Sequence, residues 1–320
     1  MMTKRNQILA AILAAQIVLA VVLFWPRSAT QAGAQALLPD LEPSAITALT
    51  VQDPDGAELT LRQESGVWVL PNADSFPVKA DKIQTTLEKL TGVDKGTLVT
   101  KTESSHRALQ VSAEDFARRV TVASGGETYL LYLGSSPSYG ATHVRLDGQA
   151  ETYLAQDLSS WDITAQVASW IDPVYVNLDT ATISRVSITN ANGELVLLRD
   201  SADQPWTVVG LEPAEGQTVN QPEIDGLVRA AGVVRMNKPL GKSDSSAYGM
   251  DTPAATIIVE HEGGAITLLI GAQDPVDLSY VVKATSSPYY VGVSEYAVKS
   301  LVEASPETLV QDIPEPAPDA

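Results

Sequence analysis

The sequence contains no cysteine. This absence excludes a disulfide, a thiolate metal site and the lipid-modified cysteine of a lipoprotein. The sequence also has no GxGxxG, GxxxxGKS/T, GxSxG or HExxH stretch, which removes the recognisable nucleotide-binding, serine-hydrolase and zinc-protease motifs. Its three histidines, His106, His143 and His261, lie in unrelated contexts, and we interpret His143 as a surface residue of an amphipathic strand. We therefore predict no catalytic residue, no metal ligand and no cofactor, and we expect that the protein is not an enzyme.

Basic residues are few. The chain has 21 Lys and Arg against 39 Asp and Glu, a net charge of −18. Residues 28–320 alone hold 18 basic and 39 acidic residues, a net charge of −21. Such a field repels nucleic acid, so we expect no nucleic-acid partner. Solubility is the simplest explanation of the acidity.

One long apolar run stands near the start of the chain. From Ile8 to Trp25 only Gln16 is polar. A helix of this length reaches about 27 Å, close to the ~30 Å hydrocarbon core of a bilayer. The run predicts a transmembrane signal anchor that contacts lipid through residues 8–25. Its representative positions are Ile8, Leu13, Ile17, Val21, Phe24 and Trp25.

The flanking charges predict the orientation of this anchor. Lys4 and Arg5 precede the run, and only Arg27 follows it closely, so the positive-inside rule places the N-terminus in the cytoplasm. The rest of the chain is then periplasmic. A cleaved signal peptide is the alternative, because small residues follow at 29–36. The apolar run is longer than the 7 to 15 residues typical of a signal peptide, which favours the anchor.

The chain repeats itself. Residues 43–162 reappear at 180–299, mostly at an offset of 137. The stretches that carry the match are Ile46–Gly56 with Ile183–Gly193, Trp68 with Trp206, and Arg119–Pro137 with Thr256–Pro275. A fixed period with preserved order indicates two copies of one module, each of ordinary domain size. We interpret the duplicated tryptophans as core residues.

Each copy has the pattern of β-strands around one amphipathic helix. The helices are expected over 79–90 and 221–231, and Asp55-Gly56 and Asn192-Gly193 predict type I′ hairpins. Short helical turns are expected at 157–163 and 294–302. Closely spaced strands favour antiparallel pairing. The fold class is therefore α+β: one N-terminal transmembrane helix followed by two tandem repeats of a mainly antiparallel β-sheet module with a packed helix.

The string DPDGAE at 53–58 is similar to the start of a calcium loop. The second copy has Asn190, Asn192, Gly193 and Glu194 at the equivalent turn, so the turn chemistry repeats and the ligand charge does not. We interpret the string as a turn.

A family resemblance follows from these features. A basic start, one apolar span, a GxWxL strand (Gly66, Trp68, Leu70) and the YLLYLG strand at 129–134 resemble the DUF4340 family of bacterial membrane-anchored proteins. The resemblance implies a place in the bacterial inner membrane. It also implies encoding beside ABC-type transport components of the kind associated with gliding motility. No activity is established for the family.

The predicted organisation has five parts. They are the cytoplasmic start and anchor (1–27), a linker (28–42), repeat module 1 (43–172), repeat module 2 (173–310) and a disordered tail (311–320). Trp161, Trp170 and Ile171 stand at the joint between the modules. They are candidates for packing between the copies or for contact with a partner chain.

Three functions are compatible with these sequence features to different degrees. The first is a non-catalytic extracytoplasmic accessory or scaffold subunit that contacts an integral membrane protein, with an ABC-type transport system as the candidate complex. The second is a module that binds a ligand or envelope polymer in the cleft between the repeats, with Tyr139, Tyr175, Tyr248 and Tyr289 as candidate contacts. The third, an envelope hydrolase, lacks any catalytic constellation. The lack of catalytic and cofactor-binding motifs favours the accessory or scaffold subunit.

Overall fold

The computed structural model describes residues 35–313. Within this range no helix is both long enough and apolar enough to cross a bilayer. The predicted anchor at 8–25, with Ile8, Leu13, Ile17, Val21, Phe24 and Trp25, lies outside the described residues.

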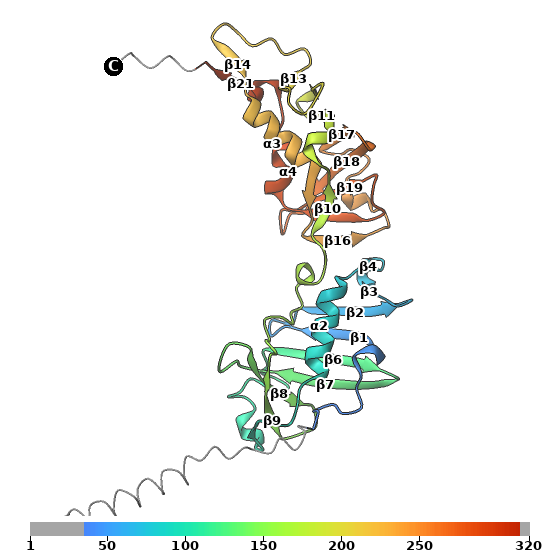
Figure 1. The fold of residues 1–320 in the computed structure, drawn as a ribbon, viewed down its shortest axis with the longest axis vertical. Helices are drawn as coiled ribbons and strands as arrows, with labels where there is room; N and C mark the ends of the chain where they lie inside the picture. The colour runs from blue at the N-terminus through green and yellow to red at the C-terminus, as the bar shows by residue number, and fades with distance from the viewer. Residues whose placement is uncertain (1–34, 314–320) are drawn as a thin grey trace, which may run out of the picture.

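A nine-stranded antiparallel sheet forms the first half of the described region (Figure 1). Its strands, in spatial order, are β4 (Phe76–Pro77), β3 (Val67–Leu70), β2 (Glu58–Glu64), β1 (Ile46–Gln52), β6 (Arg118–Ser124), β7 (Glu127–Leu133), β8 (Ala141–Leu146), β9 (Thr152–Gln156) and β5 (Leu98–Thr100). Leu49 and Leu61 are paired across β1 and β2 and fully buried, whereas the adjacent pair Thr50 and Thr60 shares a hydroxyl hydrogen bond of 3.0 Å. Alternation along the strands thus separates a core face from a polar face.

An eight-stranded antiparallel sheet forms the second half. Its strands, in spatial order, are β13 (Thr207–Val208), β12 (Gly193–Leu198), β11 (Ile183–Asn190), β17 (Ala255–His261), β18 (Gly264–Gln273), β19 (Tyr280–Ala284), β20 (Tyr290–Val293) and β16 (Lys238–Gly241). This order matches that of the first sheet from β3 to β5, strand for strand. We call the two sheets with their helices the first and second modules.

Two small sheets complete the strands. β10 (Val174–Asn177) pairs with β15 (Val233–Arg235), and β14 (Gln217–Val219) pairs with β21 (Val310–Asp312). Two residues of β21 thus fall within the segment 311–320, predicted as a tail. At the other end, Leu37, Leu38 and Leu41 of the predicted linker 28–42 are buried in the core.

The described residues contain three α-helices: α2 (Ala80–Thr91), α3 (Gln221–Gly232) and α4 (Glu295–Val302). The first two confirm the predicted helices to within one residue at each end. Ile83, Leu87 and Leu90 line one face of α2 at helical spacing and are buried against the first sheet, across which the helix lies in Figure 1. Short 3-10 helices lie at Pro43–Ala45, Pro71–Ala73, Glu103–Ser105, Val167–Ser169, Thr180–Thr182, Ser246–Tyr248 and Pro306–Leu309.

Both predicted hairpins form, but the type I′ prediction was wrong. Type I′ needs positive φ at both central residues, and neither Asp55 nor Asn192 has it. Asp53 and Asn190 instead use their side chains to hold a distant part of the chain. In the first module Asp53 forms an ion pair with Arg118 at 3.1 Å and accepts hydrogen bonds from the Thr164 hydroxyl and the Ala165 N–H.

The second module makes an equivalent contact with a different residue. The Asn190 amide donates to the carbonyls of Leu301 and Ala304, at the end of α4. The helical turn predicted at 294–302 is the helix α4. The one predicted at 157–163 forms only a hydrogen-bonded turn, because Arg118 takes the Ile163 carbonyl and Asp53 takes the following N–H.

The Asp53 contact predicts a stability effect. Asp53→Ala leaves the half-buried Arg118 without its carboxylate and should lower the free energy of unfolding by about 3 kcal/mol. Asp55→Ala, in the same turn but exposed, is the matched control and should change it by less than about 0.5 kcal/mol. Urea unfolding followed by tryptophan fluorescence measures both. Equal effects of the two substitutions would contradict this role.

Candidate functional site

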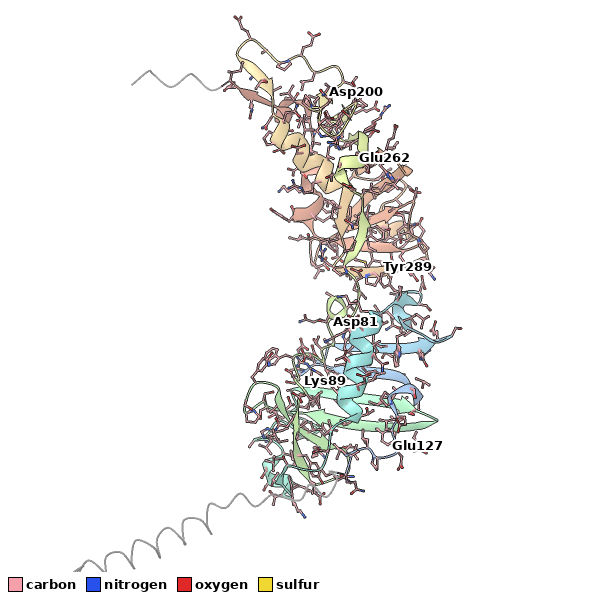
Figure 2. The ribbon with its side chains drawn as sticks, viewed as in Figure 1. Asp81, Lys89, Glu127, Asp200, Glu262 and Tyr289 are labelled. Atoms are coloured by element: carbon pink, nitrogen blue, oxygen red, sulfur yellow. The ribbon has the colours of Figure 1, made fainter. Side chains whose placement is uncertain are left out.

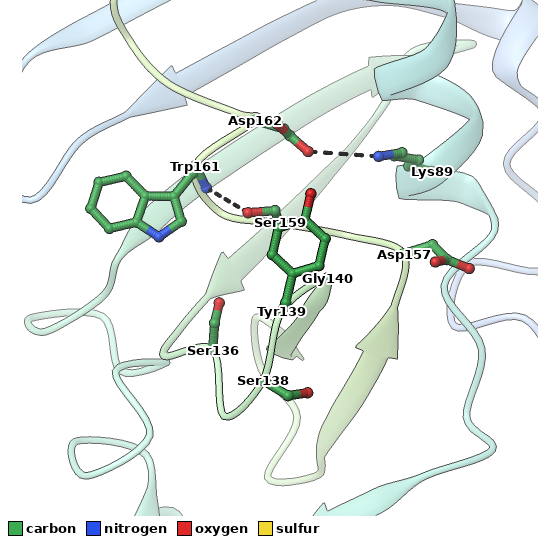
Figure 3. Close-up of a pocket in the computed structure, with 9 residues that line it drawn as sticks. All are labelled: Lys89, Ser136, Ser138, Tyr139, Gly140, Asp157, Ser159, Trp161 and Asp162. Atoms are coloured by element: carbon green, nitrogen blue, oxygen red, sulfur yellow. Dashed lines mark hydrogen bonds and ion pairs between the residues drawn. The ribbon is translucent and has the colours of Figure 1, made fainter.

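A pocket of 760 Å³ opens on the first module (Figure 3). Three segments form it: the last turn of α2, the loop between β7 and β8, and the turn after β9. Its lining residues are Lys89, Ser136, Ser138, Tyr139, Gly140, Asp157, Ser159, Trp161 and Asp162. This volume is within the range of about 300–1,000 Å³ typical of small-molecule sites.

Two exposed aromatic side chains flank this pocket. Tyr139 is fully exposed at the tip of its loop, and Trp161 is 80% exposed. The backbone N–H of Trp161 donates to the Ser159 hydroxyl at 3.2 Å, which fixes the turn that carries the ring. The Arg118 guanidinium lies 6.0 Å from the centre of the Trp161 ring. The Asp53–Arg118 pair therefore supports the pocket wall from behind.

The polar lining carries both signs of charge. Lys89 forms an ion pair with Asp162 at 3.6 Å, and Lys82 donates to the Asp162 carbonyl at 2.8 Å. Asp157 has a positive φ of 57°, an unusual conformation for a residue that is not glycine. The Ser136 hydroxyl shares a 3.1 Å hydrogen bond with Thr142. These groups can bind and orient a polar molecule.

A second site lies where the modules meet. Asp74, at the end of the 3-10 helix 71–73, accepts hydrogen bonds from the backbone N–H groups of Lys242 at 2.6 Å and Ser243 at 3.3 Å. At Gly241 a Cβ atom would lie 2.6 Å from the same carboxylate, so a side chain there would clash with it. The two N–H bonds, that of Lys242 first, hold the pKa of the Asp74 carboxyl below its usual value. We call this set of contacts the module junction.

Aromatic residues reinforce the module junction. Tyr289 donates its hydroxyl to the Ser75 carbonyl at 3.0 Å and packs edge-on against Phe76 at 4.7 Å. Tyr175 donates to the Tyr289 carbonyl and accepts from the Ala284 N–H. A pocket of 400 Å³ lies between these residues. The hydroxyls of Tyr175 and Tyr289 are thus engaged with the protein's own backbone.

The predicted site residues separate in the structure. Trp170 and Ile171 are fully buried, and the Trp170 indole N–H donates to the Thr164 carbonyl at 2.8 Å. Trp161 points outward at the pocket instead. Of the candidate tyrosines, Tyr139 lies at this pocket, and Tyr248 packs against Tyr290 within the second module at 5.2 Å. The duplicated Trp206 is buried, and Trp68 is half-buried against the same core.

Potential metal ligands do not gather in the described part of the chain. Residues 35–313 contain no group of three or more His, Asp or Glu placed to hold a metal ion. His143 is buried, contrary to its interpretation as a surface residue, and its Nδ1 lies 3.1 Å from the Ser135 hydroxyl. His106 Nε2 lies 2.8 Å from the Ala150 carbonyl.

Sequence reasoning missed the pocket and Asp74. The only available signals were an aromatic residue among serines in two loops, SSPSYG at 135–140 and LSSWD at 158–162. The site is that of a two-module, mainly antiparallel β-sheet protein with a polar and aromatic pocket.

The family of this chain is shown by comparison. The family described as a domain of unknown function, DUF4340, matches residues 68–230, half of the chain, from β3 of the first module to α3 of the second. The chain belongs to the DUF4340 family. Neither the curated proteins nor the solved structures provide a match.

Asp74 predicts a pH-dependent junction. Because the pKa of this carboxyl is lowered on folding, its contact is present at neutral pH and is lost as pH falls through the lowered pKa. Asp74→Ala should loosen the junction at neutral pH as well. Spin labels on Glu127→Cys and Glu262→Cys, exposed positions on the two modules (Figure 2), should then show a broader distance distribution.

The absence of cysteine makes this labelling specific. Asp203→Ala is the matched control, since Asp203 is exposed and its recorded hydrogen bond comes from nearby Ser201. A distance distribution unchanged by Asp74→Ala would show that the other contacts suffice.

Proposed function

We propose that the protein is a non-catalytic accessory or scaffold subunit, anchored in the bacterial inner membrane, that makes protein contacts in a membrane complex. Residues 8–25 span the membrane with the N-terminus in the cytoplasm, and the two tandem modules lie in the periplasm. The apolar run and its flanking charges support this arrangement. The partners are membrane lipid and at least one integral membrane protein.

The module junction is the observation that carries this proposal. A scaffold must hold its surfaces at defined positions, and interfaces between domains are often mobile. Here a carboxylate from the first module binds backbone N–H groups of the second, and an aromatic pair packs beside it. These contacts favour a defined arrangement of the two modules. An ABC-type transport system, which the family resemblance implies, is the candidate complex.

Ligand binding between the modules is the second candidate. The 400 Å³ pocket at the junction favours it, with Tyr175 and Tyr289 in its wall. The engagement of both hydroxyls by the protein's own backbone leaves fewer free polar groups there. The scaffold is therefore the preferred function.

The scaffold function is tested through the anchor. Replacing residues 8–25 with an unrelated apolar helix of equal length should keep the protein in the membrane but release it from its complex, because docking would need specific side chains. Gentle detergent extraction and sizing show whether the wild-type chain migrates with an integral membrane protein at fixed stoichiometry. Membrane fractionation of the replacement is the control. If the wild-type chain migrates alone, the scaffold function is wrong. If the replaced chain stays associated with the complex, docking through residues 8–25 is wrong.

A further inference from the structure

Two walls of the pocket on the first module are segments whose equivalents in the second module have a different structure. Its first wall is the turn after β9, and the equivalent segment of the second module is α4, with Val298 and Leu301 buried. Its second wall is the loop between β7 and β8. The equivalent loop of the second module is tied to the edge strand β16 by Lys238, which contacts Asp277 at 2.5 Å and Asp274 at 3.6 Å.

The first module lacks both of these features. Its turn is held in place by Asp53 and Arg118 rather than by a helix, and its loop carries serines and Tyr139 where the second module has the paired acids. Two independent segments have thus diverged around one place on a shared scaffold. The result in the first module is an open pocket with aromatic and hydroxyl groups.

The lining of this pocket selects against several ligand classes. An anion would meet Asp157 and Asp162 on a strongly acidic protein. A single cationic side chain would use Asp157 and the rings, but it would meet Lys89 and leave the serine hydroxyls without a role. A purely apolar ligand would bury the carboxylates without partners, which costs free energy.

A neutral ligand with many hydroxyl groups matches the remaining features. Serine and tyrosine hydroxyls both donate and accept, carboxylates accept, and the Lys89 ammonium donates. Tyr139 and Trp161 expose ring faces that carry partial negative charge, which attracts the C–H groups on the face of a sugar ring. Exposed rings beside mixed donors and acceptors therefore fit a carbohydrate in both its apolar and its polar surface.

We propose that this pocket binds a neutral saccharide, with its sugar rings stacked on Trp161 and Tyr139 and its hydroxyl groups hydrogen-bonded to Asp157, Ser138 and Ser159. This activity goes beyond the scaffold function and does not depend on the identity of the membrane complex.

Calorimetric titration of the full chain in lipid nanodiscs tests the proposal without sugar-based detergent. The probes are maltotetraose, cellotetraose and chitotetraose, with L-arginine methyl ester as the cationic comparison. At least one tetrasaccharide should bind saturably to the wild-type protein. Trp161→Ala and Tyr139→Ala should each weaken that binding about tenfold, equivalent to the loss of about 1.4 kcal/mol.

Tyr296→Ala is the matched control, because Tyr296 is an equally exposed aromatic residue on α4 of the second module. It should leave the affinity unchanged, and Trp161→Phe should restore part of it. Thermal unfolding of each variant checks that the fold is intact. The proposal is overturned if none of the three tetrasaccharides binds saturably, if only the arginine ester binds, or if Trp161→Ala and Tyr296→Ala behave alike.

A protein ligand in the same pocket is a separate outcome. If Trp161→Ala removes the partner chain from the detergent-extracted complex while no saccharide binds, the pocket is a protein contact and the saccharide proposal fails. If saccharide binding depends on Trp161 and the extracted protein migrates alone, the saccharide site stands and the scaffold function fails.

Discussion

The rest of the structure depends on how the first β-hairpin of each module holds the segment that follows the last strand. In the first module this is a charged contact, from Asp53 to Arg118, Thr164 and Ala165. The same segment continues to Trp170, whose indole N–H binds the Thr164 carbonyl and whose carbonyl accepts from Lys79 at the start of α2. One hairpin thus positions a pocket wall, the core tryptophan and the chain that enters the second module.

In the second module the hairpin holds the following segment through the side-chain amide of Asn190. Asn190 donates to two carbonyls near the end of α4, where helix carbonyls lack partners within the helix. A carboxylate can only accept, so Asp53 binds N–H and O–H groups instead. This difference between Asp and Asn accompanies a helix in one module and an open turn in the other. The two similar sheets thus present different surfaces at this place.

At the module junction, single side chains of one module bind backbone groups of the other. Asp74 binds two backbone N–H groups, Gly241 leaves room for its carboxylate, and Tyr289 reaches the Ser75 carbonyl. Backbone partners suit a fixed arrangement, because they cannot change rotamer as side chains do. The pocket lies on the first module alone, so the ligand binding proposed for it and the contacts of the module junction involve different residues.

Local sequence determined much of the fold. Apolar spacing defined α2 and α3, the Asp-Gly and Asn-Gly pairs marked both hairpins, and the repeat at an offset of 137 predicted two copies of one module. The helix and turn signals lie within a few residues of each other, where periodicity and turn chemistry act, whereas the repeat is recognised from matching stretches in the two halves. The position of the pocket, the contacts of the module junction and the conformation of residues 157–163 were decided only by the tertiary structure. Asp53 meets Thr164 across 111 residues, and Asp74 meets Lys242 across 168, so no local pattern predicts that these groups will be in contact.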